Sequence, residues 1–361
     1  MRLLFVGTNR GGGGTESHFI TLARSLQEAG HEVAAVVYPG APISIGLQGS
    51  GVKLIDGVFR NAFDPRGTST VWRTCSTFKP DWIVGSFSKE YWPLALLASL
   101  RGIKLALFKH MDFSMRPATN YFIPRLATRF IVISDFMRKR FIERGIPSER
   151  LQVLHNPLDL GYFKLLPGQR AECRAKLGYA DEDVVLGFVG ALHPDKGIFQ
   201  LADSLNQAMA QNPRIKAMWI GEGPGDADLK ARISIGGFAA HHTQHNWTPD
   251  VRPYYAAMDM LAMCSVGGET FGRVSVEAQA CGVPVLCSNN GGIPETLQPG
   301  VTGLLLPPGD VAAWRDAILD MASKPQLRTQ MITSGRYWVE HNFSAPVIAG
   351  QFIALLEKPL E

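Results

Sequence analysis

The 361-residue sequence lacks a long apolar run, and its richest apolar segment, Trp92 to Leu100, ends at Arg101. A membrane-spanning helix needs about 20 mostly apolar residues, so none is expected. The N-terminus has one arginine and a short apolar stretch, Leu3 to Gly7, whereas the core of a signal peptide has roughly 7–15 apolar residues. We therefore expect a cytoplasmic protein whose first residues form a buried strand.

Patterns that bind metal ions or form disulfides are also missing. The five cysteines are scattered, odd in number and nowhere two residues apart, which favours neither a disulfide framework nor a zinc site. Asp226-Ala-Asp228 follows a glycine-rich stretch and is expected to be a solvated turn. The histidines at 241, 242 and 245 have no carboxylate or cysteine beside them. We expect no bound metal ion.

Charge is unevenly distributed. The net charge is +4, yet residues 1–160 hold 20 Lys and Arg against 12 Asp and Glu, and residues 161–361 hold 16 against 20. Such asymmetry can mark a half that meets anionic partners, although a harmless surface bias explains it equally well. The overall composition, 46% apolar and 19% charged, is that of a soluble globular protein.

Short apolar runs alternate with helical patterns twice along the chain, which predicts parallel sheets covered by helices. In the first half, residues 16–29 have apolar residues at helical spacing. Strands are expected at 3–6, 32–37, 82–84, 105–108 and 129–133, and again at 184–189, 217–220, 260–263, 283–286 and 303–306. A last helical pattern covers Val347 to Leu356.

The chain exceeds the size at which a single core keeps growing, so the alternation predicts two domains. The expected fold class is α/β, with two Rossmann-like doubly wound parallel-sheet domains facing a central cleft. We expect domains at residues 1–163 and 164–343, followed by a C-terminal helix at 344–361 that can pack back on the first domain.

The block from Glu269 to Glu277, Glu-Thr-Phe-Gly-Arg-Val-Ser-Val-Glu, places two carboxylates beside an expected helix start. Free N–H groups and the helix dipole there favour an anion such as a diphosphate. A glycoside hydrolase would hold its carboxylates roughly 5–10 Å apart. Eight residues of helix span about 12 Å, which suits the two ends of a sugar nucleotide better.

Two further motifs follow expected strands. Gly11 to Gly14 can approach a phosphate or leave room for a substrate, although it lacks both Gly-x-Gly-x-x-Gly and a phosphate-loop lysine; a structural turn is the alternative. Lys196 follows the strand at 184–189 and is either a surface charge or a partner for a diphosphate.

Taken in order, the motifs resemble those of the retaining glycosyltransferases of family 4, which have the GT-B fold. The similarity runs almost end to end. It includes Gly13 to Glu16, Phe108-Lys-His110, Val132-Ile-Ser134, Asn156-Pro-Leu-Asp159, Gly190 to Gly197, Gly221 to Pro224, and the glutamate block with its Gly291-Gly-x-x-Glu295 tail.

The resemblance implies roles for these positions. Glu269 would contact the donor sugar, Glu277 the ribose, Lys196 the diphosphate and His110 the reaction centre, with the loop near Thr243 to Trp247 beside the base. The implied catalytic residues are His110, Glu269 and Lys196. The implied donor-binding residues are Gly13, Gly14, Gly190, Lys196, Thr243, His245, Glu269, Thr270, Phe271, Gly272, Arg273, Val274 and Glu277. The implied acceptor-binding residues are Gly14, Thr15, Glu16 and His110.

Two positions depart from the family pattern. Ala191 stands where the family usually has an arginine, which removes one of the two cations expected on the diphosphate. Either Arg273 or the helix start substitutes for it, or the leaving group is less well neutralised, which would predict weaker nucleotide binding. Pro157 follows Asn156 where the family has glycine, so that turn differs.

The expected function is metal-independent transfer of a hexose from a nucleoside diphosphate sugar, with retention, to a hydroxyl of a glycan or glycolipid in cell-envelope polysaccharide or lipopolysaccharide biosynthesis. Its expected partners are the donor and this acceptor; no nucleic acid is expected. The alternatives are a nucleotide-sugar epimerase or hydrolase of the same fold, and an idle sugar-nucleotide-binding protein. Residues 134–144 combine basic and apolar residues, which indicates either core packing or peripheral contact with an anionic membrane on the inner face of the cytoplasmic membrane.

Overall fold

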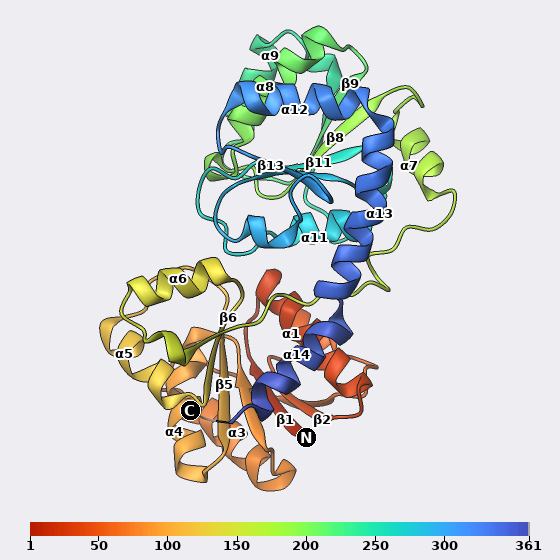
Figure 1. The fold of residues 1–361 in the computed structure, drawn as a ribbon. Coiled ribbons are helices and arrows are strands. Elements are labelled where there is room, and N and C mark those ends of the chain that lie inside the picture. The colour runs from red at the N-terminus through yellow and green to blue at the C-terminus, as the bar shows by residue number, and fades with distance from the viewer. Residues whose placement is uncertain (360–361) are drawn as a thin grey trace. The chain divides into compact units, whose positions relative to one another are not determined.

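Two parallel β-sheets form the framework of residues 1–359, the part of the chain that the computed structural model describes (Figure 1). Unit 1 comprises Met1–Asp159 together with the C-terminal segment that starts at Phe343, and unit 2 comprises Leu160–Asn342. The chain passes between the units at 159/160 and at 342/343. Expectations about residues 360–361 lie outside the described residues.

The sheet of unit 1 has seven parallel strands in the order β3-β2-β1-β4-β5-β6-β7. The strands are β1 (Arg2–Gly7), β2 (Glu32–Val37), β3 (Lys53–Asp56), β4 (Trp82–Gly85), β5 (Lys104–Lys109), β6 (Arg129–Val132) and β7 (Leu151–Val153). The helices are α1 (Gly14–Glu28), α2 (Pro42–Gly46), α3 (Pro65–Phe78), α4 (Tyr91–Arg101), α5 (Pro117–Leu126), α6 (Asp135–Glu143) and α14 (Ala345–Glu357), with 3₁₀ turns η1 (Ser88–Glu90) and η2 (Ser148–Arg150).

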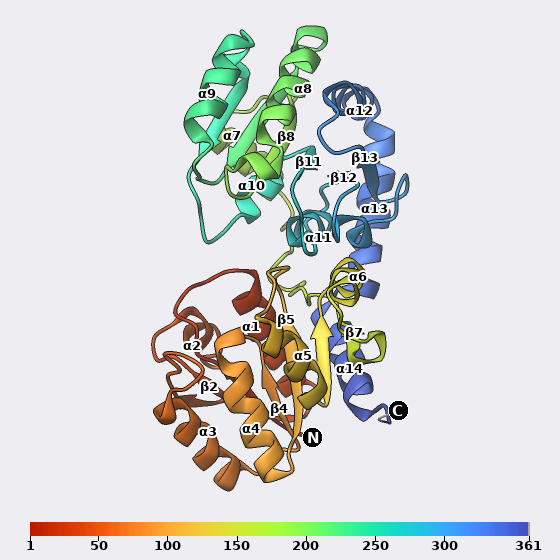
Figure 2. The ribbon, with the colours of Figure 1, turned by 90° about the vertical axis from the view of Figure 1, so that its left-hand side faces the viewer.

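Alternate residues of these strands face opposite layers of helices, as a doubly wound sheet requires. Phe5 and Phe108 point to the face covered by α1 and α14, where the Phe108 and Phe352 rings lie 5.5 Å apart. On the other face, α4 places Tyr91 beside Phe130. Figure 2 shows α3 and α4 on one side of the strands and α14 on the other.

Unit 2 repeats this design with six parallel strands in the order β10-β9-β8-β11-β12-β13. The strands are β8 (Val184–Val189), β9 (Ile215–Ile220), β10 (His242–His245), β11 (Met260–Met263), β12 (Val285–Ser288) and β13 (Gly303–Leu306). The helices are α7 (Gln169–Leu177), α8 (Ile198–Gln211), α9 (Asp226–Ile235), α10 (Arg252–Ala257), α11 (Arg273–Ala280), α12 (Val311–Ser323) and α13 (Pro325–Asn342), with 3₁₀ turns η3 (Pro194–Lys196), η4 (Ala239–His241) and η5 (Ile293–Thr296).

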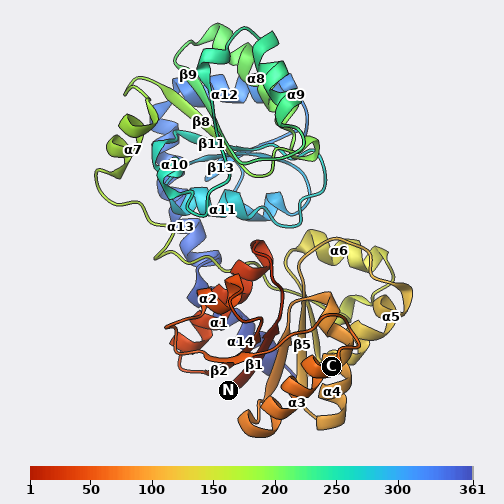
Figure 3. The same ribbon diagram turned by 180° about the vertical axis from the view of Figure 1, so that it is seen from behind.

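The helices of unit 2 also form two layers. The core side chains of α8, α9 and α12 pack together on one face of the sheet, and α10 and α11 lie on the other face, as Figure 3 shows from behind. The expected α/β class with two doubly wound parallel sheets is therefore confirmed.

The two chain crossings are tied together within unit 1. Leu158 N–H donates to the Phe343 carbonyl at 2.7 Å, and Ala345 N–H donates to the Leu158 carbonyl at 2.9 Å. Immediately afterwards α14 runs along α1, burying Ile348, Phe352 and Leu356 in the core of unit 1. The C-terminal segment is thus a structural part of the N-terminal unit.

Two local expectations were wrong. Asp226 and Asp228 belong to the first turn of helix α9, where the Asp226 carboxylate pairs with Lys230 at 2.7 Å, because acidic residues favour a helix N-terminus. The stretch from Thr243 to Trp247 is not wholly a loop, since residues 242–245 form strand β10. None of the helices within residues 1–359 combines the length and apolar character needed to cross a bilayer.

Candidate functional site

The centre of the candidate site in unit 2 is an ion pair between Lys196 and Glu269. Lys196 ends the 3₁₀ turn η3 after β8, and Glu269 lies in the loop between β11 and α11. The Lys196 Nζ donates to Glu269 Oε2 at 2.5 Å, and the two side chains are 36% and 17% exposed. Both groups therefore remain accessible while each neutralises the other.

Close backbone packing brings this pair together. A Cβ atom added at Gly197 would lie 2.0 Å from the Cys264 carbonyl oxygen, and Gly197 has a φ of +72°. Only glycine fits both constraints. The turn that carries Lys196 therefore packs closely against the end of β11, where the Glu269 loop begins. The Cys264 thiol also donates to the Lys196 carbonyl at 3.1 Å.

The Gly291-Gly292 tail holds the other side of the Glu269 loop. A Cβ at Gly291 would lie 2.1 Å from the Glu269 carbonyl oxygen, while the Gly292 N–H donates to that carbonyl at 2.8 Å. A Cβ at Gly292 would lie 2.5 Å from the Thr270 carbonyl. The loop that carries the Glu269 carboxylate can therefore pack in this way only because residues 291 and 292 have no side chain.

Helix α11 begins only at Arg273, with Gly272 as its N-cap at a φ of +105° and no side-chain cap. The sequence-based estimate that both glutamates lie along one helix was therefore wrong, because Glu269 precedes the helix. Phe271 is 2% exposed and anchors the turn, and Val274 lies half-buried in the first helical turn. The N-terminus of α11 therefore follows Glu269 in the chain after a short turn.

Glu277 is held by two partners. Its Oε1 accepts from Arg273 Nε at 2.7 Å, and its Oε2 accepts from the Tyr255 hydroxyl at 3.2 Å. Arg273 was expected as a substitute for the missing cation at Ala191, yet here it binds Glu277, while its Nη1 is buried without a hydrogen-bond partner among residues 1–359. Tyr255 was missed in the sequence, because 22 residues separate it from Glu277 and no motif marks it. Its burial raises the pKa of the phenol well above the usual value.

The remaining expected donor residues of unit 2 lie at the carboxyl end of β8 and on β10. Gly190 follows β8 with a φ of +152°, and a Cβ at Gly221 would collide with its carbonyl at 1.9 Å. Thr243 shares a 2.5 Å hydrogen bond with the Tyr179 hydroxyl, and the His245 ring packs against Tyr254. Both side chains therefore have structural partners already.

In unit 1, His110 directly follows β5 and is 7% exposed. Its ring stacks on Phe108 at 5.8 Å and meets the edge of His18 at 4.7 Å. Burial, followed by the nearby Lys109 charge, lowers the pKa of His110 to about 3, so the imidazole is neutral at neutral pH. Its Nε2 is buried without a hydrogen-bond partner among residues 1–359. His18 was not anticipated from the sequence, although helical spacing from Gly14 places it on the buried face of α1.

The glycine loop opens α1 at Gly14, with Gly13 as the N-cap. Thr15 is half-buried in the first turn, and the buried Glu16 accepts from Asn9 Nδ2 at 2.5 Å. This hydrogen bond links the first turn of α1 to Asn9, which lies shortly after the end of β1. No cluster of three or more metal-ligating side chains occurs among the described residues.

Comparisons with known proteins match both units. The family model "Glycosyltransferase Family 4" covers residues 12–162, and "Glycosyl transferases group 1" covers residues 169–338. A Mycolicibacterium smegmatis protein named GDP-mannose-dependent alpha-(1-6)-phosphatidylinositol monomannoside mannosyltransferase is 31% identical over 70% of this chain and 69% of its own length. The chain belongs to glycosyltransferase family 4. The expectation of a glycosyltransferase is thereby confirmed at the level of the family.

One further curated relative and one solved structure are also similar to this chain. The D-inositol 3-phosphate glycosyltransferase of Mycobacterium bovis is 29% identical over 70% of this chain. The match covers 55% of that relative, so the chain spans just over half of the relative's length. The Anabaena protein HepE, solved in complex with UDP and glucose, superposes with a TM-score of 0.83 over 99% of both chains at 23% identity. The latter likeness establishes the GT-B fold alone.

Proposed function

We propose that the chain transfers a hexose from a nucleoside diphosphate sugar to an acceptor hydroxyl with retention and without a metal ion. Unit 2 binds the donor and unit 1 most of the acceptor. The observation that carries the proposal is the Lys196–Glu269 pair, together with the uncapped start of α11 that follows Glu269 in the chain. A cation, a helix N-terminus and a carboxylate for sugar hydroxyls are the groups that a sugar diphosphate requires.

The mechanism we propose is front-face transfer, in which the departing diphosphate takes the proton of the acceptor hydroxyl. The Lys196 ammonium and the α11 amides stabilise the developing negative charge, a task that a metal ion performs in other enzymes. Glu269 binds sugar hydroxyls near the reacting carbon, and Glu277 binds the ribose. Because His110 is neutral, it contributes a hydrogen bond from Nε2 rather than a charge.

The named relatives support more than one donor. One relative is described as GDP-mannose-dependent, and the HepE structure contains UDP and glucose. The donor base is therefore tested first, by the thermal shift of the purified protein with UDP, GDP and ADP. The acceptor, which we propose to be a glycan or glycolipid of the cell envelope, is then tested with the preferred donor.

Activity is measured as nucleoside diphosphate release with UDP- and GDP-sugars in excess EDTA, and the product anomer is identified by NMR. We expect turnover to survive chelation, the donor configuration to be retained and Glu269→Ala to lose activity, whereas Glu182→Ala at an exposed carboxylate of unit 2 should not. Complete loss of activity in EDTA would contradict metal independence. Formation of a sugar product without acceptor would favour an epimerase or hydrolase. Nucleotide binding without any turnover would favour a catalytically idle binding protein.

We further propose peripheral contact with the inner face of the cytoplasmic membrane. Five large apolar side chains are exposed beside the basic helix α6, namely Met111, Phe113, Tyr121, Phe122 and Leu126. Asp112 links its neighbours Met111 and Phe113 to the α6 region by pairing with Arg140 and Arg144. Helix α5 is linked to the same region through Asn120 Nδ2, which donates to the Arg144 carbonyl at 2.9 Å. Apolar and basic groups together suit an anionic bilayer.

Sedimentation with anionic vesicles tests the membrane contact. Phe113→Ser combined with Phe122→Ser should reduce binding, whereas Ile235→Ser, at an 87% exposed apolar residue of unit 2, should not. Equal binding by both variants would contradict the proposed surface.

A further inference from the structure

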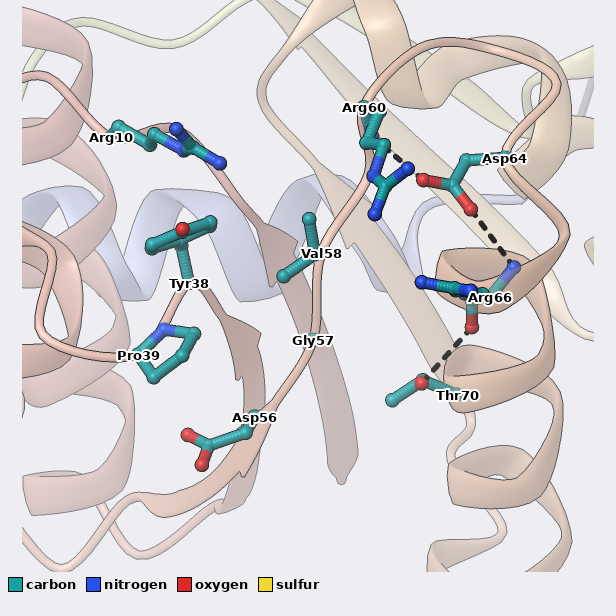
Figure 4. Close-up of a pocket in the computed structure, with 10 residues that line it drawn as sticks. All are labelled: Arg10, Tyr38, Pro39, Asp56, Gly57, Val58, Arg60, Asp64, Arg66 and Thr70. Atoms are coloured by element: carbon teal, nitrogen blue, oxygen red, sulfur yellow. Dashed lines mark hydrogen bonds between the residues drawn. The ribbon is translucent and has the colours of Figure 1, made fainter.

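A pocket of about 380 Å³ lies in unit 1 at the carboxyl ends of β1, β2 and β3. Figure 4 shows three arginines around it: Arg10 after β1, Arg60 in the loop after β3, and Arg66 in the first turn of α3. The guanidinium carbon of Arg10 lies 4.5 Å from the centre of the Tyr38 ring, which follows β2. The motif-based assignment of site residues included none of these side chains.

None of the three guanidiniums forms an ion pair with a carboxylate within residues 1–359. Asp64 also lines the pocket, but its carboxylate caps α3, with Oδ1 accepting from the Arg66 N–H and Oδ2 from the Arg60 N–H, both at 3.0 Å. These backbone bonds lower the pKa of Asp64, and the nearby Arg60 charge adds to the effect, so Asp64 offsets part of the charge of Arg60. Asp56 is exposed at the rim.

The loop that carries Arg60 is fixed from three sides. The Gly57 N–H donates to the Val37 carbonyl at 2.9 Å, and the Phe59 N–H donates to the Thr8 hydroxyl at 3.2 Å. A Cβ at Gly67 would lie 2.6 Å from the Val58 carbonyl, so α3 packs directly on the loop. The arginines therefore project from a rigid frame, which reduces the entropy lost when a ligand binds.

Thr8 is itself held by a buried carboxylate. Its N–H and hydroxyl both donate to Glu90 Oε1, at 2.8 and 2.7 Å, and Glu90 is fully buried. The Lys89 Nζ donates to the Thr8 carbonyl at 2.9 Å. Through the Thr8 hydroxyl, which accepts from the Phe59 N–H, this buried network anchors the loop that carries Arg60.

We propose that this pocket binds a phosphate group of the acceptor, with Arg10, Arg60 and Arg66 as its ligands and Asp56 placed for an adjacent hydroxyl. Planar guanidiniums match the oxygens of a phosphate, and several unpaired arginines in one pocket balance its charge of up to two. The chemical class is thus a phosphorylated sugar or polyol. This inference rests on the proposed assignment of unit 1 to the acceptor.

The pocket and His110 occupy the same edge of one sheet. The strand order places three strand spacings between β2 and β5, which corresponds to about 14 Å at 4.7–4.9 Å per strand. The phosphate is therefore bound at a distance from the reacting hydroxyl. It orients the acceptor without taking part in the chemistry, so its loss should raise KM more than it lowers kcat.

The test measures binding to the full chain at low salt, without donor, by calorimetry and vesicle sedimentation. The probes are inorganic phosphate, glucose 6-phosphate with glucose as its uncharged counterpart, and phosphatidylcholine vesicles with and without 20% phosphatidylinositol. The variants are Arg60→Gln and Arg66→Gln, which keep the backbone N–H groups that Asp64 uses. Arg73→Gln, an exposed arginine of α3 outside the pocket, is the matched control.

We expect binding of inorganic phosphate that weakens about tenfold or more in each pocket variant and is unchanged in Arg73→Gln. Arginine-dependent binding of glucose 6-phosphate identifies a soluble phosphosugar as the source, and arginine-dependent binding of phosphatidylinositol vesicles identifies a lipid headgroup. Equal affinities of wild type and both pocket variants for all phosphate probes would overturn the inference. Failure of glycosyl transfer with every donor would instead overturn the proposed function and leave these binding results standing.

Discussion

Replacing Lys196 by methionine should reduce kcat/KM about 10- to 150-fold. Lys196 has an accessible ammonium paired with Glu269, which precedes α11 in the chain, and Ala191 provides no second cation. A hydrogen bond to a charged group contributes about 1.5–3 kcal/mol, and 1.4 kcal/mol corresponds to a tenfold change. If the ammonium acts mainly on the departing diphosphate, most of the loss appears in kcat rather than KM.

Stability should change little in this variant. The paired side chains are 36% and 17% exposed, so solvent screening limits the contribution of the pair to roughly 1 kcal/mol or less. Lys230→Met is the control, because Lys230 also forms a lysine–carboxylate pair, at 2.7 Å with Asp226, but on the outer surface of α9. Steady-state kinetics and thermal unfolding compare the variants. A loss of less than about threefold relative to Lys230→Met would refute the role of Lys196.

Three further perturbations follow from the same contacts. Ala191→Arg should lower the Kd for the nucleoside diphosphate severalfold, measured by calorimetry, because Ala191 is exposed and the new guanidinium supplies a second cation; unchanged affinity would show that position 191 does not reach the phosphates. Glu269→Gln removes the carboxylate that competes for Lys196, so the diphosphate alone should bind up to about fivefold more tightly while transfer falls; weaker binding would contradict this competition. Burial raises the pKa of Glu90 from 4.5 to about 7, so the folded state binds the extra proton and stability falls as pH rises from about 4.5 to 7. Glu90→Gln should remove most of this fall, worth about 3 kcal/mol, and parallel pH profiles of thermal unfolding for the two proteins would contradict it.

Much of the fold could be predicted because central parallel strands are continuous apolar runs. Strands β8 and β11 have the expected bounds, and β2 and β13 as well. The three strands that were missed, β3, β7 and β10, each lie at an edge of a sheet. Edge strands are partly solvated, so Lys-Leu-Ile-Asp at 53–56 and His-Thr-Gln-His at 242–245 do not show an apolar run.

The candidate site was predictable only in its motifs. The Glu269 block and Lys196 follow expected strands, but their direct contact joins residues 73 positions apart, and no local pattern encodes it. The same holds for the partner of Glu277, the Tyr255 hydroxyl. Pocket arginines such as Arg60 are isolated charges in sequence, and only the parallel order of β1, β2 and β3 gathers them at one edge.

The return of α14 to unit 1 determines the order in which the protein can be completed during synthesis. At 5–20 residues per second, roughly 10–40 s separate the appearance of residue 159 from that of Leu356. During this interval α1 covers this face of the sheet, but the part of Phe108 that later packs against Phe352 is left open. Phe108, on which His110 stacks, lies under Phe352. The half of the chain that is made first therefore completes the packing beneath His110 only when the C-terminal helix is made.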